Sequence, residues 1–196
     1  MATIERQSFR LSGSCRSCAS FCIAALLMVA GCGGGTAAWK TFHDSKAGFS
    51  ADFPGNVTQP QGIEKGGAGA PQTYHFECRS SNGLTYQVTF TAQHNSSSEI
   101  AARLDSLEKQ ILPVDSRYTS LKTKRIALAD AKGIEQVYQK DTKDAGKAFM
   151  RVRTFIVPDG DYYVTVDSET SADAYSADAE RFLNSFKLDA SSDKAK

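Results

Sequence analysis

The chain has 196 residues, with 23 lysines and arginines against 22 acidic residues and a formal net charge of +1 at pH 7. This balance excludes the strongly basic surface of a nucleic-acid-binding protein and a broad polybasic membrane-binding face. The length suffices for one domain with its own hydrophobic core, so we expect no dependence on a disulfide or a structural metal ion.

The N-terminal segment has the order of an export signal. Arg6, Arg10 and Arg16 precede an apolar run over residues 21–28, and Val29-Ala30-Gly31-Cys32 follows it. The last four residues resemble the lipobox of bacterial lipoproteins. The resemblance implies that residues 1–31 are a cleaved signal peptide and that the thiol of Cys32 carries a diacylglycerol, with palmitate-type acyl chains. It also implies that the domain is held by its lipid on the extracytoplasmic side of a bacterial cell-envelope membrane.

The alternative is an uncleaved membrane helix, since no residue from Ala19 to Trp39 is charged. The strongly apolar part stops at Ala30, however, and a membrane span needs about 20 predominantly apolar residues. The glycines that follow also weaken a helix, because glycine costs about 1 kcal/mol relative to alanine. We therefore favour the cleaved signal, followed by a lipidated N-terminus and a flexible spacer over residues 32–38.

The distribution of the five cysteines agrees with processing at this point. Cys15, Cys18 and Cys22 lie in the predicted leader and Cys32 would carry the lipid, which leaves Cys78. Cys78 alternates with apolar residues in a predicted strand, so we expect a buried core residue rather than a reactive thiol.

The domain is predicted to span residues 39–188. Alternation and turn residues predict strands over 39–43, 49–53, 73–79 and 84–92, with a loop over 59–72 and a hairpin at Asn82-Gly83. A capping box at 96–99 predicts a helix to about 112. Strands follow over about 119–128, 133–140, 147–157 and 161–167. A closing helix is predicted over 172–186, with Tyr175, Phe182 and Phe186 on its apolar face, before a polar tail over 189–196.

Three local motifs carry a resemblance to a known family. They are the segments 48–54 (GFSADFP), 155–164 (FIVPDGDYYV) and 179–186 (AERFLNSF). Together they resemble the PsbP-like superfamily, which is named for an extrinsic photosystem subunit. The resemblance implies an α+β fold in which helices pack on an antiparallel sheet. It also implies a family with accessory and protein-binding members and no common catalytic apparatus.

Signatures of catalysis or metal binding are missing from the sequence. His43, His75 and His94 form no H-E-x-x-H, and the chain contains no G-x-S-x-G. The aspartates at 141, 144, 159, 161 and 167 form no EF-hand spacing, so we favour solvated turns over a calcium site. We accordingly expect a protein that is not an enzyme and has no cofactor and no metal ion.

One strand carries a candidate partner face. Arg151 and Arg153 alternate with their neighbours and project from the same side as Phe149 and Phe155. Arginine flanked by aromatic residues can bind a partner or an anionic ligand. The alternative, which we favour, is a solvated sheet face or one covered by a helix.

These observations lead to a first hypothesis of a non-enzymatic envelope lipoprotein, an accessory or protein-binding module. Its partners would be the membrane, through the lipid, and an envelope protein, with no nucleic acid. A small-ligand carrier with a pocket between sheet and helices is the alternative, and an unrecognised hydrolase is a third hypothesis.

Overall fold

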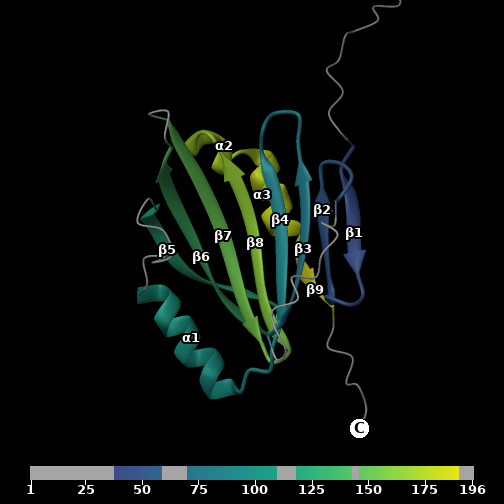
Figure 1. The fold of residues 1–196 in the computed structure, drawn as a ribbon, viewed down its shortest axis with the longest axis vertical. Coiled ribbons are helices and arrows are strands. Elements are labelled where there is room, and N and C mark those ends of the chain that lie inside the picture. The colour runs from purple at the N-terminus through teal and green to yellow at the C-terminus, as the bar shows by residue number, and fades with distance from the viewer. Residues whose placement is uncertain (1–37, 59–69, 110–117, 143–145, 190–196) are drawn as a thin grey trace, which may run out of the picture. The chain divides into compact units, whose positions relative to one another are not determined.

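Two antiparallel sheets and three helices make up the parts of the chain that the computed structural model describes, residues 38–58, 70–109, 118–142 and 146–189 (Figure 1). The smaller sheet has the strand order β1-β2-β9, with the ranges Lys40–Asp44, Phe49–Phe53 and Lys187–Leu188. The larger sheet has the order β3-β4-β8-β7-β6-β5, with the ranges Gln72–Arg79, Thr85–Ala92, Gly160–Ser168, Lys147–Val157, Ala131–Asp141 and Tyr118–Leu128. The predicted α+β class, an antiparallel sheet with packed helices, is confirmed.

The alternation in the sequence correctly assigns the two faces of the strands. In β4, Tyr86, Val88 and Phe90 are buried, whereas the threonines and the glutamine between them are half-buried. Cys78 of β3 is buried on the same face, as predicted. The predicted hairpin joins β3 to β4, and Gly83 has a φ of 86°, a conformation that glycine adopts without steric cost.

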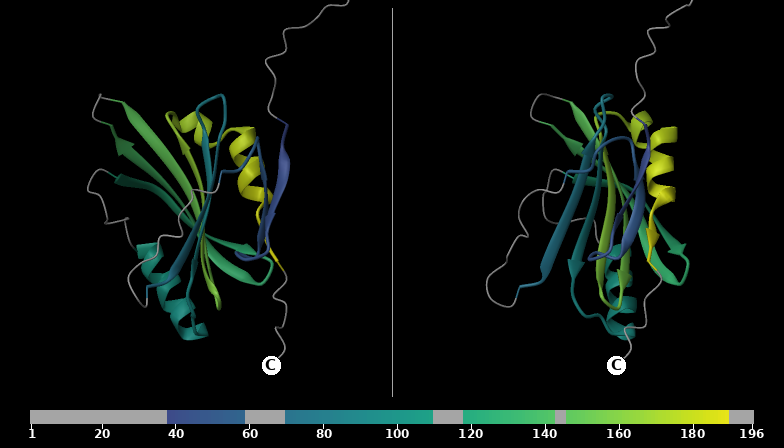
Figure 2. Two further views of the ribbon diagram at one scale, coloured as in Figure 1. Left: turned by 45° about the vertical axis from the view of Figure 1, so that its right-hand side comes forward. Right: turned by 90° about the vertical axis from the view of Figure 1, so that its right-hand side faces the viewer.

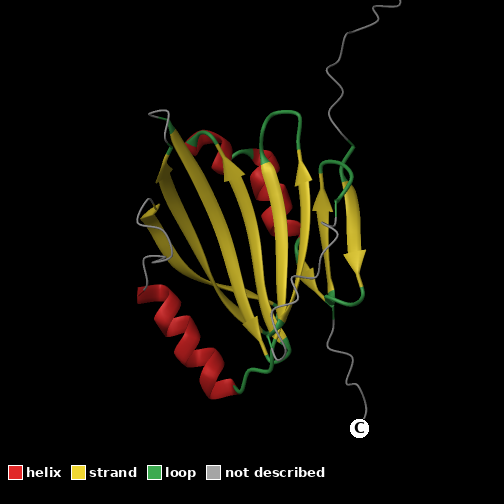
Figure 3. Ribbon diagram, viewed as in Figure 1, coloured by secondary structure: helices red, strands yellow, loops and turns green. Residues whose placement is uncertain are grey.

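The helices lie on opposite faces of the larger sheet. α3 (Ala177–Ser185) packs on β2 and β8, on the side of the smaller sheet, whereas α1 (Ser97–Lys109) packs on β5, β6 and β7 (Figures 2 and 3). Phe155 and Ile156, neighbours in β7, show this division. Phe155 stacks on Phe186 after α3, and Ile156 packs with Leu104 of α1.

Aromatic rings fill the space between the two sheets. The centroid of the Phe53 ring is 5.0 Å from that of Phe182, and Phe49 lies 5.0 Å from Phe76 and 5.7 Å from Phe186. All five of these side chains are at most 1% exposed. The smaller sheet and α3 are thus joined to the larger sheet by one continuous core.

The helix α1 starts where the capping box predicts. The hydroxyl of Ser96 accepts a hydrogen bond from the backbone N–H of Glu99 at 3.3 Å, and the Glu99 carboxylate accepts one from the N–H of Ser96 at 2.7 Å. Hydrogen bonds from Ser96 lower the pKa of Glu99.

The prediction of a single closing helix is wrong, because the structure has two helices in this segment. α2 (Ser171–Ala174) ends before Tyr175, and the side chain of Ser176 then accepts a hydrogen bond from Ala179 N–H at 3.3 Å to cap α3. A serine that caps a new helix interrupts the pattern that we assigned to one helix. As a result Tyr175 is 46% exposed and lies outside the apolar face on which we placed it.

The predicted lipobox, spacer and leader fall in residues 1–37, and the predicted tail falls largely in residues 190–196; both ranges lie outside the described part of the chain. Among the described helices, none has the length and apolar character needed to cross a membrane.

Candidate binding groove

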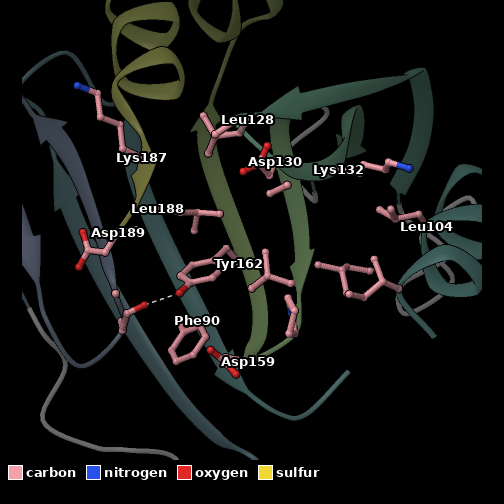
Figure 4. A pocket seen from close by; sticks show the side chains of 18 of the residues that line it. Phe90, Leu104, Leu128, Asp130, Lys132, Asp159, Tyr162, Lys187, Leu188 and Asp189 are labelled. Atoms are coloured by element: carbon pink, nitrogen blue, oxygen red, sulfur yellow. Dashed lines mark hydrogen bonds between the residues drawn. The ribbon is translucent and has the colours of Figure 1, made fainter. Parts of the chain in front are cut away.

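A groove of about 1400 Å³ runs across one end of the two sheets (Figure 4). Five parts of the chain form most of it: the β1–β2 turn, α1, the turn of the β5–β6 hairpin, the turn of the β7–β8 hairpin, and β9. It is lined by residues 45–48, Phe90, Ser97, Ile100, Ala101, Leu104, Asp105, Arg125, 128–132, 156–159, Tyr162 and 187–189.

The floor of the groove is apolar and held rigidly. Tyr162 is 5% exposed, its ring stacks on Phe90 at 4.7 Å, and its hydroxyl donates a hydrogen bond of 2.5 Å to the carbonyl of Ala47. Burial raises the pKa of the Tyr162 hydroxyl to about 12, so this group stays a hydrogen-bond donor at physiological pH. Leu128 and Leu188 are half-buried beside it and extend the apolar surface.

Exposed charges of both signs surround this floor. Four cations and four carboxylates line the groove: Lys46, Arg125, Lys132 and Lys187, and Asp105, Asp130, Asp159 and Asp189. Some already pair within the chain: Arg125 donates to Asp105 at 2.5 Å, and His43 lies 3.0 Å from Asp189. The rim is therefore balanced in charge and does not favour a polyanionic ligand.

A buried polar cluster fixes the α1 wall of the groove. Arg103 of α1 pairs with Asp161 of β8, which is 2% exposed, and also donates to the side-chain carbonyl of Asn95 at 2.8 Å. Asn95 donates to the carbonyl of Val157 at 2.8 Å, and Gln93 donates to Asp161 at 2.6 Å. Because every member of the cluster contacts another, the start of α1 is held against the β7–β8 hairpin.

This cluster was not predicted. Asp161 was assigned with four other aspartates to solvated turns, and this assignment is wrong for Asp161, which is buried against Arg103. The alternation in β8 places Asp161 on one sheet face, but only the packing of α1 on that face brings a cation to it. Local spacing alone contains no signal for such a contact.

The predicted partner face carries α3 of the same chain. Arg151 is 3% exposed and donates to Glu180 of α3 at 2.6 Å and to Glu135 of β6 at 3.0 Å. Arg153 donates to Glu135 at 2.6 Å and to the carbonyl of Leu183 at 2.7 Å. Phe155 is 3% exposed in the core, and Phe149 is half-buried near the start of β7. These four side chains form no open surface, which agrees with the alternative of a covering helix.

Glu135 is the centre of this ion network. Burial opposes its ionisation, but hydrogen bonds from Arg153, Lys124 and Arg151 outweigh burial and lower its pKa to about 2. The carboxylate is thus charged at physiological pH and links β6 to β5 and β7, and Arg151 extends the network to Glu180 of α3.

The remaining candidate residues are dispersed. His75 contacts the Thr89 hydroxyl at 2.9 Å on the polar face of β3, and His94 is exposed before α1. Burial and the charge of Glu77 raise the pKa of the Cys78 thiol, which keeps it protonated. Within the described ranges, no three histidine, cysteine or acidic side chains are grouped as metal ligands require. Asp144 lies outside those ranges, and so does Cys32.

Comparison with protein-family models and with curated proteins finds no match for this chain. Among solved structures, the chain is similar to cyanobacterial PsbP (CyanoP) from Synechocystis sp. PCC 6803, at 13% identity over 80% of this chain and 95% of that one, with a TM-score of 0.48. It is also similar to PA94 from Pseudomonas aeruginosa, a protein of unknown function, at 13% identity over 69% of this chain and 85% of that one, with a TM-score of 0.37. Similarity at this level carries no argument about function, and membership of the PsbP-like family stays a prediction.

Proposed function

We propose that the protein is a non-enzymatic binding module, held at a bacterial envelope membrane by a lipid on Cys32, and that its groove binds an apolar segment of a partner protein. The observation that carries the proposal is the groove itself. It combines an apolar floor, fixed by Tyr162 and Phe90, with a charged rim at the edge of the domain.

The size and openness of the groove favour a protein segment over a small molecule. Pockets for small ligands typically enclose about 300–1,000 Å³ and bury most of the ligand. This groove is larger, and exposed side chains such as Lys132, Asp130 and Asp159 border it. An apolar centre with a polar rim is the usual composition of a protein–protein interface.

The positions of the two carboxyl groups with the largest pKa shifts also support binding rather than catalysis. Glu135, with its lowered pKa, lies beneath α3, and Asp167, whose pKa burial raises to about 6, lies at the opposite end of β8 from the groove. Groups tuned for acid–base chemistry are expected inside a cleft. Here the two shifts have structural causes at a distance from it.

Variants of three leucines test the binding function of the groove. Leu128→Asp and Leu188→Asp place a charge on its floor, whereas Leu121→Asp places the same charge on β5, where Leu121 is 52% exposed outside the groove. In protein extracted gently from envelopes, we expect the wild type and Leu121→Asp to migrate as a complex larger than the monomer, and the two groove variants to migrate as monomers. Thermal unfolding of each variant shows that the fold is intact. Equal migration of all four proteins would exclude the groove as the binding site.

The membrane anchor is tested separately. Cys32→Ala is expected to abolish labelling by radioactive palmitate and to release the domain from the membrane fraction, since stable anchoring requires acyl chains. A Cys32→Ala protein that stays membrane-bound and uncleaved would support the uncleaved helix instead.

A small-ligand carrier is the second candidate, and the apolar floor is the observation that favours it. A carrier predicts saturable binding of one fluorescent fatty acid per monomer of purified protein, lost in Leu128→Asp. A binding module predicts no such stoichiometric binding.

A further inference from the structure

The chain enters the domain at the end opposite to the groove. Trp39 directly precedes β1, and β1 runs away from it into the turn 45–48, which lines the groove (Figure 1). Five residues of β-strand span about 17 Å, so Trp39 and that turn are separated by at least this length.

The longer strand β7 also runs from the Trp39 end of the domain to the groove end. Lys147 begins β7 at the end where Trp39 lies, and the turn at Pro158 and Asp159, which lines the groove, follows the other end (Figure 1). The eleven residues of β7 correspond to about 33 Å between its first and last residues.

Trp39 is fixed to the folded domain. Its ring lies 5.9 Å from that of Tyr86, and the guanidinium carbon of Arg181 lies 4.6 Å from its centroid. Arg181 of α3 is also 3.7 Å from Asp52 of β2. The point at which the chain leaves the domain is therefore defined by contacts with a strand of each sheet and with α3.

We propose that the Trp39 end of the domain faces the membrane, that the groove opens away from it, and that the partner of the groove approaches from the aqueous compartment. The proposal rests on the proposed lipid at Cys32. Seven peptide steps join Cys32 to Trp39, and they span at most about 25 Å when fully extended.

The length of this tether distinguishes an orientation with the Trp39 end toward the bilayer from one with the groove toward the bilayer. With the Trp39 end toward the bilayer, the tether crosses any short distance at little cost. To bring the groove to the bilayer, Trp39 must stand off by about 17–33 Å, the strand lengths given above. That distance takes most or all of the covalent reach, and holding a chain fully extended costs conformational entropy. A lipid of the same bilayer is accordingly a poor occupant of the groove.

The chain contains one tryptophan, which makes the orientation measurable. Full-length protein, processed in cells, is extracted and reconstituted into phosphatidylcholine vesicles that carry dansyl-labelled headgroups, and energy transfer from tryptophan to dansyl is recorded. Two matched variants in a Trp39→Phe background move the donor: Lys147→Trp at the Trp39 end and Lys132→Trp in the groove. Both positions are exposed and lie on strands.

We expect transfer from Trp39 and from Lys147→Trp, and transfer at least about two-fold weaker from Lys132→Trp, because strand length places it farther from the headgroups. Equal or stronger transfer from Lys132→Trp in protein that floats with the vesicles would overturn the orientation and leave the anchor intact. Protein that does not float would overturn the anchor and the orientation together, while the groove variants would still test binding.

Discussion

The two faces of the larger sheet are covered in different ways. On one face, α3 and the segment after it bury Phe182, Leu183 and Phe186 completely and close over an ion network. On the other, α1 buries Leu104 but leaves Leu107 and the groove-lining Ile100 only half-buried. The contact of α3 is thus fully buried, whereas the contact of α1 is only partly buried.

Two carboxyl groups with large pKa shifts, one on each face, differ in how their charges are compensated. Glu135 lies on the α3 face with three cations around it, and its pKa falls to about 2. Asp167 lies on the α1 face, beyond that helix, where burial and the charge of Glu77 raise its pKa to about 6 against a smaller effect of Lys140. The charge of Glu135 is thus stabilised by its neighbours, whereas the charge of Asp167 is poorly compensated.

The largest expected effect is loss of the α3 contact. Phe182→Ala should lower the free energy of unfolding by about 3–5 kcal/mol, because a fully buried ring is removed from the core. Leu107→Ala on α1 serves as the matched comparison and should cost about 1 kcal/mol, in the lower part of the range for single substitutions, since Leu107 is only half-buried. Urea unfolding measures both. Equal costs would remove the distinction between the two faces.

Breaking the ion network should lower the free energy of unfolding by a similar amount, and this loss should depend on pH. Glu135→Gln leaves Arg151 and Arg153 without their shared carboxylate, and removal of one partner of a buried pair costs about 3–5 kcal/mol. The pKa of Glu135 in the folded protein is below its ordinary value of 4.5, so the stabilisation is present above pH 4.5 and is lost as pH falls toward 2.

The wild type and Glu135→Gln should therefore converge in stability between pH 4.5 and pH 2. Thermal unfolding in acidic buffers follows the convergence. A constant difference over this range would mean that the carboxylate contributes by packing alone.

The contribution of Asp167 to stability should change with pH in the direction opposite to that of Glu135. The pKa of Asp167 in the folded protein is above its ordinary value of 3.8, so ionisation costs stability as pH rises from about 4 to 6. Asp167→Asn should raise the free energy of unfolding by about 1–3 kcal/mol at pH 7 and have no effect at pH 4. A destabilised Asp167→Asn at pH 7 would indicate that the charge has a partner that favours it.

The smallest effect is expected on the rim of the groove. Arg125 contacts Asp105 and Glu108, but all three side chains are exposed. Exposed ion pairs contribute about 0–1 kcal/mol, so Arg125→Ala should leave the unfolding midpoint nearly unchanged. A large loss would show that these charges hold α1 in place, a role that we assign to the Arg103 cluster.

Much of the fold follows from local sequence patterns. The alternation in β4 and the capping box at Ser96 each specify a local geometry, and both predictions are confirmed. The prediction of a single closing helix was wrong because a serine such as Ser176 is compatible both with a helix interior and with a helix cap. β9 was missed because a two-residue strand exists only through its pairing with β2.

The candidate site could not be predicted in the same way. The groove arises from segments as distant as the turn 45–48 and residues 187–189, which tertiary packing alone brings together. The arginines of β7 were visible as a pattern, but whether a helix covers them depends on α3, more than twenty residues later.

Site-specific photocrosslinking in intact cells tests the central claim most directly. A photoreactive amino acid at position 132 reports on the groove, and the same residue at 147 reports on an exposed strand position at the other end. The account predicts a discrete protein adduct from position 132, its loss when Leu128→Asp is added, and no such adduct from position 147. The same adduct from both positions, or an adduct at 132 that survives Leu128→Asp, would contradict the groove as the binding surface.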